Sequence, residues 1–386
     1  MIVCAHRYTV RNKIDSKRAM LGMCYVLEPD LSLPENHNIG ALNVLVVREA
    51  LHGKRMTIDN DFDNHAKYGV CQLGTSVAWS KEFSDKNTTA NYALLGAPGC
   101  FTWRGNLFGQ RTNSLRKYQL ALNEGNHLKY TKHGHLGLAV TTGYFFNNKL
   151  QYVGGAPHVS LGKLGNGTVY FYEYESQTDE LQVIPDKFLL GNSFGSGFGF
   201  SLATLDANGD GKDDLLVGAP FCDNEGRSGS VFIYLNTEES LHISSFLEIR
   251  GVVSQDGQFG LSLTNAGDLN RDGYEDFAVG APYVGSGVVY IFLGGPGGLS
   301  TAGHGSKGIY QTFGAEYLAS QIIEPSDLIS PLNSIKISPL KTFGSSLSGG
   351  MDLDRNNYPG DIKLLLFILL LQLHFVSPLK NLKIKK

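Results

Sequence analysis

The chain repeats itself with a period of about sixty residues, and this period limits the possible folds more than any other feature of the sequence. The tripeptide Gly-Ala-Pro begins at positions 96, 155, 218 and 280, so its spacings are 59, 63 and 62 residues. Such a period indicates one supersecondary unit that packs against the next copy of itself. A pair made of an apolar residue and glycine precedes each tripeptide and occurs once more near the C-terminus, at Tyr68-Gly69, Leu136-Gly137, Phe198-Gly199, Phe259-Gly260 and Phe343-Gly344.

Each repeat contains short segments rich in Val, Ile, Phe and Tyr that are bounded by glycine, such as DLLVGAP at 214–220 and SVFIYL at 230–235. These segments are typical of β-strands. No helical periodicity is sustained between Gly69 and Phe292. About four strands per repeat predict the blades of a β-propeller. A β-solenoid or a large sandwich is the alternative, although a sandwich lacks such regular self-similarity.

Two repeats share the nine-residue pattern D-x-[DN]-x-D-G-x-x-D, at 206–214 and 268–276. Alternate side chains and one carbonyl turn oxygen atoms toward one point, and glycine at the sixth position permits the sharp turn. Ligands that are all oxygen, several of them carboxylates, suit Ca²⁺, and the lack of Cys and His argues against zinc. The predicted ligands are Asp206, Asn208, Asp210, Lys212 (carbonyl) and Asp214 in the first loop, and Asp268, Asn270, Asp272, Tyr274 (carbonyl) and Asp276 in the second.

Strands rather than helices are expected after both loops, so neither loop is an EF-hand. A structural role is expected for each ion, because it neutralises carboxylates that otherwise repel one another. A polar turn without an ion is the alternative. A third loop begins at Asp352, but its ninth position is Gly360 instead of Asp, so this site is expected to be weak or empty; its ligands would be Asp352, Asp354, Asn356 and the carbonyl of Tyr358.

Other chemistry has little support in the sequence. His127, His133 and His135 offer imidazoles that could act as metal ligands, but a polar loop explains them better. No set of nucleophile, base and orienting residue stands out, so the chain is not expected to be an enzyme. The net charge of −3 gives no basic field for nucleic acid. The sequons predict glycosylation at Asn87 and Asn166.

The repeats resemble the FG-GAP repeats of integrin alpha subunits, in which seven form a β-propeller. The similar segments follow the order of the family's blades. VCAHRYTV with GMCYVL is similar to the second blade, YGVCQLGTSVAW with LLGAPGCFTWRG to the third, and GLAV with YVGGAP to the fourth. The two repeats with acidic loops are similar to the fifth and sixth blades, and FGSSLSGGMDLDRNNYP to the seventh. The combination is most similar to the laminin-binding class without an inserted I domain. It implies an all-β fold, a seven-bladed β-propeller present as an incomplete ring of blades 3–6 with parts of blades 2 and 7.

The resemblance divides the chain along the repeat. The expected boundaries are 1–60 for a partial second blade, 61–125 for the third, 126–185 for the fourth, 186–250 for the fifth, 251–312 for the sixth, 313–361 for an insertion and a partial seventh blade, and 362–386 for an apolar and basic tail outside the family pattern. The insertion is inferred because Phe259 and Phe343 are 84 residues apart, against 61 for Phe198 and Phe259.

The resemblance also implies a function. It implies a cell-adhesion receptor subunit on the extracellular side of the plasma membrane, which pairs with an integrin beta subunit and helps to bind an extracellular matrix protein of the laminin type. Tyr25 and Phe200 match positions that line the beta-binding face, and Cys4 and Cys24 match a family disulfide. Cys71 matches a position whose usual partner about a dozen residues earlier is missing.

Both ends depart from the family pattern. No signal peptide is visible, and the apolar run Leu364–Val376 has 13 residues, whereas a membrane-spanning helix needs ~20. The family pattern is expected to stop near Pro359, where unrelated sequence such as a retained intron follows. The alternatives are the propeller of a secreted hydrolase such as a phospholipase, or a truncated product with no adhesive activity.

Overall fold

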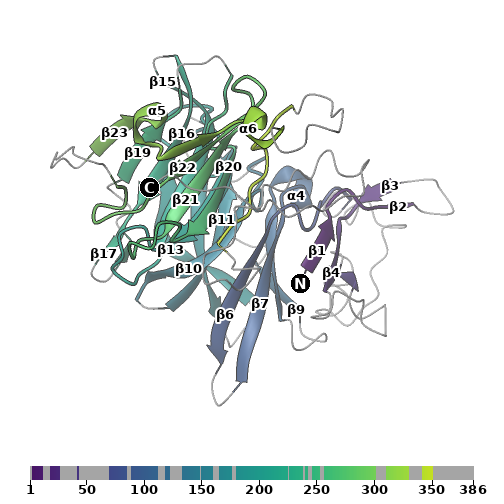
Figure 1. Cartoon of the computed structure of the whole chain (residues 1–386). Coiled ribbons are helices and arrows are strands. Elements are labelled where there is room, and N and C mark those ends of the chain that lie inside the picture. The colour runs from purple at the N-terminus through teal and green to yellow at the C-terminus, as the bar shows by residue number, and fades with distance from the viewer. Residues whose placement is uncertain are drawn as a thin grey trace. The chain divides into compact units, whose positions relative to one another are not determined.

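The computed structural model describes residues 2–11, 18–26, 41–42, 69–84, 88–111, 118–121, 133–147, 149–159, 165–175, 180–224, 226–237, 240–241, 246–252, 256–300, 310–329 and 341–350. The described residues are almost all β-strands and turns, which confirms the predicted all-β class (Figure 1). They form two compact units, one made of 1–143 with 149–199 and the other of 144–148 with 200–386. The third calcium loop, the apolar run after it and Asn87 lie outside the described residues.

The first unit contains the third and fourth repeats, each a meander of antiparallel strands. Within each repeat, each strand pairs with the next strand along the chain. Figure 1 shows the long hairpin of β6 and β7, whose pairing runs from Val77 with Leu95 to Ser84 with Thr88. The strands are β6 (Val77–Ser84), β7 (Thr88–Ala97), β8 (Asn106–Arg111) and β9 (Tyr118–Ala121), then β10 (Val140–Phe146), β11 (Lys149–Ala156), β12 (Thr168–Glu175) and β13 (Glu180–Leu190).

The N-terminal residues supply part of the preceding repeat. The strand β4 (Met23–Val26) lies between β1 (Ile2–Ala5) and β5 (Ala41–Leu42), and β2 (Thr9–Arg11) pairs with β3 (Arg18–Met20). Cys4 lies opposite Cys24 and forms a disulfide with it. In the later repeats the glycine of Gly-Ala-Pro lies opposite a strand residue in the same way, as Gly155 does with Val169. The disulfide therefore occupies the place that this glycine occupies elsewhere.

The second unit contains the fifth and sixth repeats. The fifth repeat orders its strands as β14 (Ser201–Leu205), β15 (Asp214–Asn224), β16 (Arg227–Tyr234) and β19 (Phe246–Arg250). The sixth orders them as β20 (Ser262–Gly267), β21 (Asp276–Ala281), β22 (Val288–Phe292) and β24 (Gln321–Ile323). Two short strands, β17 (Asn236–Thr237) and β18 (Ser240–Leu241), form a small hairpin. Each repeat in this unit thus has the four-stranded sheet that the period predicts.

Part of the predicted insertion belongs to the sixth sheet. β24 pairs with β22, with Ile323 opposite Val289, as Ile249 lies opposite Val231 in the fifth repeat. The extra residues are therefore split between the connection before β24 and the segment after it. The first part contains β23 (Tyr310–Gly314) and the short helix α5 (Ala315–Leu318), and α6 (Pro325–Ile329) opens the second. β23 extends the fifth repeat's sheet by pairing in parallel with β19.

The structure also corrects one motif assignment. The apolar-glycine pair of the third repeat is Leu73-Gly74 rather than Tyr68-Gly69, and Tyr68 lies outside the described residues. The amide of Gly74 donates to the carbonyl of Gly96 at 2.9 Å. The same bond joins Gly137 to Gly155 at 3.0 Å and Gly260 to Gly280 at 3.1 Å. The pair must directly precede the first strand of its repeat to reach this carbonyl, and Gly69 is too far upstream.

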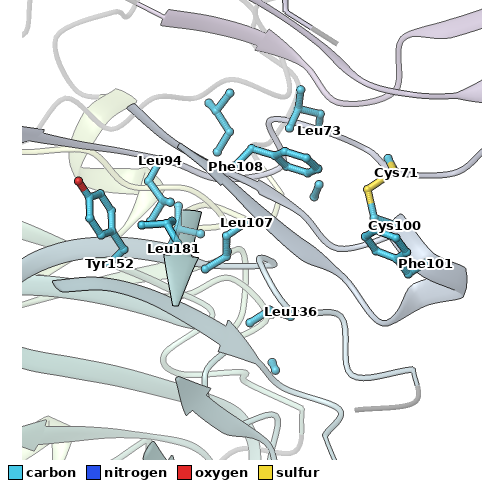
Figure 2. Close-up of a cluster of buried hydrophobic side chains, with 14 of the residues drawn as sticks. Cys71, Leu73, Leu94, Cys100, Phe101, Leu107, Phe108, Leu136, Tyr152 and Leu181 are labelled. Carbon is cyan, nitrogen blue, oxygen red and sulfur yellow. A yellow bond between two sulfur atoms is a disulfide. The ribbon is translucent and has the colours of Figure 1, made fainter. Parts of the chain in front are cut away.

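Each unit has its own hydrophobic core. In the first unit Leu94, Leu107 and Tyr152 are buried together with the disulfide between Cys71 and Cys100 (Figure 2). The sequence left the partner of Cys71 open, and the structure supplies it from the turn after Gly-Ala-Pro. The second core gathers aromatic residues, with the rings of Phe277 and Phe292 stacked 5.1 Å apart. No helix among the described residues has the length and apolar character needed to cross a membrane.

Candidate calcium loops

The two predicted calcium loops connect the first and second strands of their repeats. The loop at 206–214 joins β14 to β15, and the loop at 268–276 joins β20 to β21. Both lie in the second unit. The sixth-position glycines, Gly211 and Gly273, have φ angles of 80° and 92°, a region that side-chain-bearing residues rarely adopt. The sequence therefore folds these loops the same way because the same turn requirement recurs at the same position.

The hydrogen bonds within the first loop wrap the backbone around its acidic side chains. The Asp206 carboxylate accepts the amides of Asp210 and Gly211, at 3.1 and 2.8 Å. The Asn208 side-chain oxygen accepts the amide of Asp210 at 3.1 Å, and Asp210 accepts the amide of Lys212 at 3.0 Å. These bonds hold carboxylate and amide oxygens on the inner side of a tight turn.

The second loop repeats this pattern bond for bond. Asp268 accepts the amides of Asp272 and Gly273 at 3.1 and 2.9 Å. Asn270 accepts the amide of Asp272 at 3.1 Å, and Asp272 accepts the amide of Tyr274 at 3.1 Å. Two segments 62 residues apart in sequence thus adopt one conformation.

The ninth residue of each loop is fully buried and firmly held. Asp214 accepts the amides of Ala207 and Asn236, at 3.0 and 2.7 Å. Asp276 accepts those of Leu269 and Gly294, at 2.7 and 2.9 Å. Burial raises the pKa of Asp214 to about 7 and of Asp276 to about 6, and the backbone donors oppose this rise. A buried carboxylate of this kind favours a nearby cation.

The donor set of both loops fits a hard divalent cation, because every predicted ligand is an oxygen and three in each loop are carboxylates. Within the described part of the chain, no group of three His, Cys, Asp or Glu side chains already converges as a metal cluster. The carboxylates at positions 1 and 5 instead accept amides of their own loop.

The histidine candidates are arranged differently from the sequence pattern. His135 lies against His158, with 2.8 Å between their Nδ1 atoms, and the Trp103 ring contacts His135 edge-on at 5.2 Å. Burial, with His158 and His133 nearby, lowers the pKa of His135 to about 4. His127 lies outside the described residues. His158, which follows Gly-Ala-Pro, was not a candidate from sequence because only tertiary folding brings it to His135.

The predicted partner-binding aromatics lie in different units. Tyr25 is half-buried on β4, paired with Val3 of β1 and Ala41 of β5. Phe200 is half-buried directly after the Phe198-Gly199 pair, and its ring contacts that of Phe221 at 5.6 Å. Phe221 is 43% exposed, so an aromatic pair reaches the surface at this point.

The structure argues against glycosylation at Asn166. Its side chain is only 7% exposed, and Nδ2 donates to the carbonyl of Gly191 at 2.7 Å. A glycan would be attached to this same nitrogen and would require the turn to open. Asn166 therefore serves as a structural residue in the folded chain.

Comparisons with known proteins agree with the repeat structure. The FG-GAP repeat model matches residues 198–234 and 259–292, which contain the two calcium loops' repeats. Integrin alpha-7 of Rattus norvegicus is 32% identical over 375 residues, covering 93% of this chain and 28% of the relative. Integrin alpha-6 of Gallus gallus is 28% identical over 379 residues, and integrin alpha-3 of Cricetulus griseus is 31% identical over 370 residues; each match covers 93% of this chain and 30% of the relative.

The chain spans only 28–30% of the length of these relatives. The mostly β structure and the FG-GAP match are consistent with an incomplete seven-bladed propeller. The chain is therefore a homologue of the FG-GAP propeller region of integrin alpha subunits.

Proposed function

We propose that this chain is the extracellular, calcium-stabilised propeller of a cell-adhesion receptor subunit. It pairs with an integrin beta subunit and contributes to binding an extracellular matrix protein of the laminin type. The observation that carries the calcium part is the recurrence of one hydrogen-bonded loop, with the same oxygen donors, at 206–214 and 268–276. The pairing and the matrix ligand are supported by the similarity to integrins alpha-7, alpha-6 and alpha-3.

In this proposal each Ca²⁺ would be held by the side chains at positions 1, 3, 5 and 9 and the carbonyl at position 7. The bound ion supplies charge neutralisation and crosslinks the loop. The chain's own residues orient the ligands: the position-6 glycines set the turn, and the amides of Asn236 and Gly294 hold the buried carboxylates of Asp214 and Asp276. The same backbone amides keep these carboxylates from rotating away from the loop.

Calcium binding is tested by titrating the metal-free chain with CaCl₂ in a calorimeter. Two ions per chain are expected in the described loops, and Asp210→Ala and Asp272→Ala are each expected to remove one. Asp186→Ala, which changes an aspartate outside both loops, is the control. Heats that fit no binding at millimolar calcium would refute the calcium part.

Receptor pairing is tested by co-expressing the chain with an integrin beta subunit and measuring co-purification. Phe200→Ala is expected to weaken capture by about tenfold if this aromatic lies in the interface. Tyr283→Ala changes an exposed aromatic at a different loop and is the comparison. Matrix binding is then measured on immobilised laminin, with collagen as the comparison surface, and equal capture on both would count against a laminin-type ligand.

A further inference from the structure

The two calcium loops are joined by a residue that the ligand pattern leaves out. Glu275 stands at position 8 of the second loop, between the carbonyl ligand Tyr274 and the closing ligand Asp276. Its carboxylate accepts the backbone amide of Asp206, the first residue of the other loop, at 2.8 Å. Its own amide donates to the carbonyl of Asp206 at 3.0 Å. Both backbone groups of Asp206 are thus held by one residue of the second loop.

A side-chain amide supports this clamp. The Nδ2 atom of Asn265 donates to Glu275 at 2.9 Å and to the carbonyl of Thr204 at 3.2 Å. Its oxygen accepts the amide of Gly267 at 2.7 Å. Asn265 therefore fixes the Glu275 carboxylate in place between the strand that leads into the first loop and the strand that leads into the second.

Two consecutive glycines make a second bridge between the loops. The amide of Gly294 donates to the closing carboxylate of Asp276 at 2.9 Å. The next amide, that of Gly295, donates to the carbonyl of Ala207 in the first loop at 2.9 Å. A side chain at Gly294 would collide with the carbonyl of Ala207, so the chains approach closely here. Consecutive backbone amides therefore contact Asp276 of the second loop and Ala207 of the first.

The first loop also has an acidic residue at position 8, but this residue bonds to the fourth repeat. Asp213 stands at position 8 there and accepts the amide of Tyr144 at 2.8 Å. Tyr144 occupies the place in the fourth repeat that Asp206 occupies in the fifth, but its repeat has no acidic loop. An acid at position 8 therefore joins each described loop to the repeat before it, and of these two acids Glu275 is the one that reaches another candidate calcium loop.

We infer that Glu275 is a positioning residue that couples the two calcium loops, so that an ion in one loop raises the calcium affinity of the other. This inference rests on the proposed calcium binding. With an ion in the second loop, Tyr274 and Asp276 would be held as its ligands, and Glu275 between them would hold Asp206 in place before the first loop binds. By thermodynamic linkage, calcium in the first loop raises the calcium affinity of the second loop by the same factor. This factor is expected to be roughly 5 or more.

The test is a calcium titration of the full chain by calorimetry, with one loop disabled at a time. Asp272→Ala is expected to lower the calcium affinity of the first loop by about fivefold or more, and Asp210→Ala to lower that of the second loop by the same factor. In a Glu275→Ala background, disabling one loop is expected to leave the affinity of the other within twofold. Glu275→Gln retains an acceptor oxygen for the Asp206 amide and is expected to restore most of the coupling.

The matched control is Asp213→Ala, which removes the same type of bond to the fourth repeat, where there is no acidic loop. It is expected to preserve the coupling factor even where it lowers overall stability, and circular dichroism of each variant checks folding. Two ions that bind with independent affinities in the unaltered chain would overturn the coupling and leave the proposed calcium function intact. Failure of either loop to bind calcium would overturn both.

Discussion

At the scale of single residues, the glycines of the repeat explain why the sequence motif recurs. A Cβ atom at Gly155 would collide with the carbonyl of Gly199, and one at Gly218 would collide with that of Gly260. Each Gly-Ala-Pro glycine therefore lies against the apolar-glycine pair of the next repeat. The motif recurs because the two backbones approach so closely that no residue larger than glycine fits there.

A second residue-scale feature, the contact of His135 with His158, makes stability depend on pH. The pKa of His135 falls from 6.5 to about 4 in the folded chain, mainly because the ring is buried. The stability that depends on neutral His135 is fully present above pH 6.5. It is lost as the pH falls toward 4, because His135 then binds a proton more readily in the unfolded chain than in the folded chain. When the pH falls from 7.5 to 5.0, the unaltered chain is expected to lose unfolding free energy. His135→Asn is expected to make this loss smaller by on the order of 1 kcal/mol, a value already reduced because His135 is partly exposed to solvent.

Urea unfolding at both pH values measures this difference. His133→Asn is the control for backbone strain, because His133 is exposed, has the same φ of 57° as His135 and is the smallest of the three causes that lower the pKa of His135. Asparagine tolerates this backbone conformation, so strain is matched in the two variants. An equal pH dependence in His135→Asn and the unaltered chain would contradict the assignment.

At the scale of strands, a serine hydroxyl joins one repeat to the next. Ser201 donates to the carbonyl of Gly260 at 2.7 Å, and Ser262 donates to that of Gly344 at 2.6 Å. Ser76 makes the same bond to Gly137 at 2.9 Å. The fourth repeat has Ala139 at this position and so lacks the hydroxyl. The first strands are thus tied to their successors by side chains as well as by packing.

Removing this hydroxyl is expected to destabilise the second unit. Ser201→Ala leaves the buried carbonyl of Gly260 without its 2.7 Å donor, which costs about 1–2 kcal/mol. Ser326→Ala, at an exposed serine of α6, is expected to change stability by less than about 0.5 kcal/mol. Chemical denaturation of both variants in saturating calcium makes the comparison, and equal midpoints would show that the hydroxyl contributes nothing.

At the scale of the whole molecule, both candidate calcium loops that the structure describes lie in one of the two units. Both loops fall within residues 200–386, whereas residues 1–143 and 149–199 form the other unit. Each unit has a separate buried cluster. Regions with their own cores open with their own free energies, so the two units are expected to respond differently to loss of calcium.

Chelation is therefore expected to act on one unit. Hydrogen exchange in EDTA is expected to accelerate in β14, β15, β20 and β21, and to stay unchanged in β7, β8, β11 and β12. At free calcium 100 times the Kd, a single occupied site taken alone stabilises its unit by about 2.7 kcal/mol. Magnesium at the same concentration is the control, because the smaller ion dehydrates reluctantly and fits a flexible oxygen loop less well. Equal acceleration in both units would contradict this confinement.

Much of the fold was predictable because the same physical requirement recurs every sixty residues. The turn glycines and the alternating carboxylates of the two loops are local, so the sequence alone predicts their shape. The sequence leaves two alignments of the third repeat, five residues apart, because Gly69 and Gly74 both follow apolar residues. The bond from Gly74 to Gly96 distinguishes them. The fourth strand of the sixth repeat was hidden in an apparent insertion because three residues carry too little periodicity.

The sequence by itself determined the repeat, the β class, the family resemblance and the turn shared by the two candidate calcium loops, because each depends on residues close together in the chain. Only the tertiary structure decided which distant residues meet. It joined Cys71 to Cys100, His135 to His158 and Glu275 to Asp206, and it buried Asn166. These contacts arise where strands and loops of one repeat pack on another, and no local pattern encodes that packing.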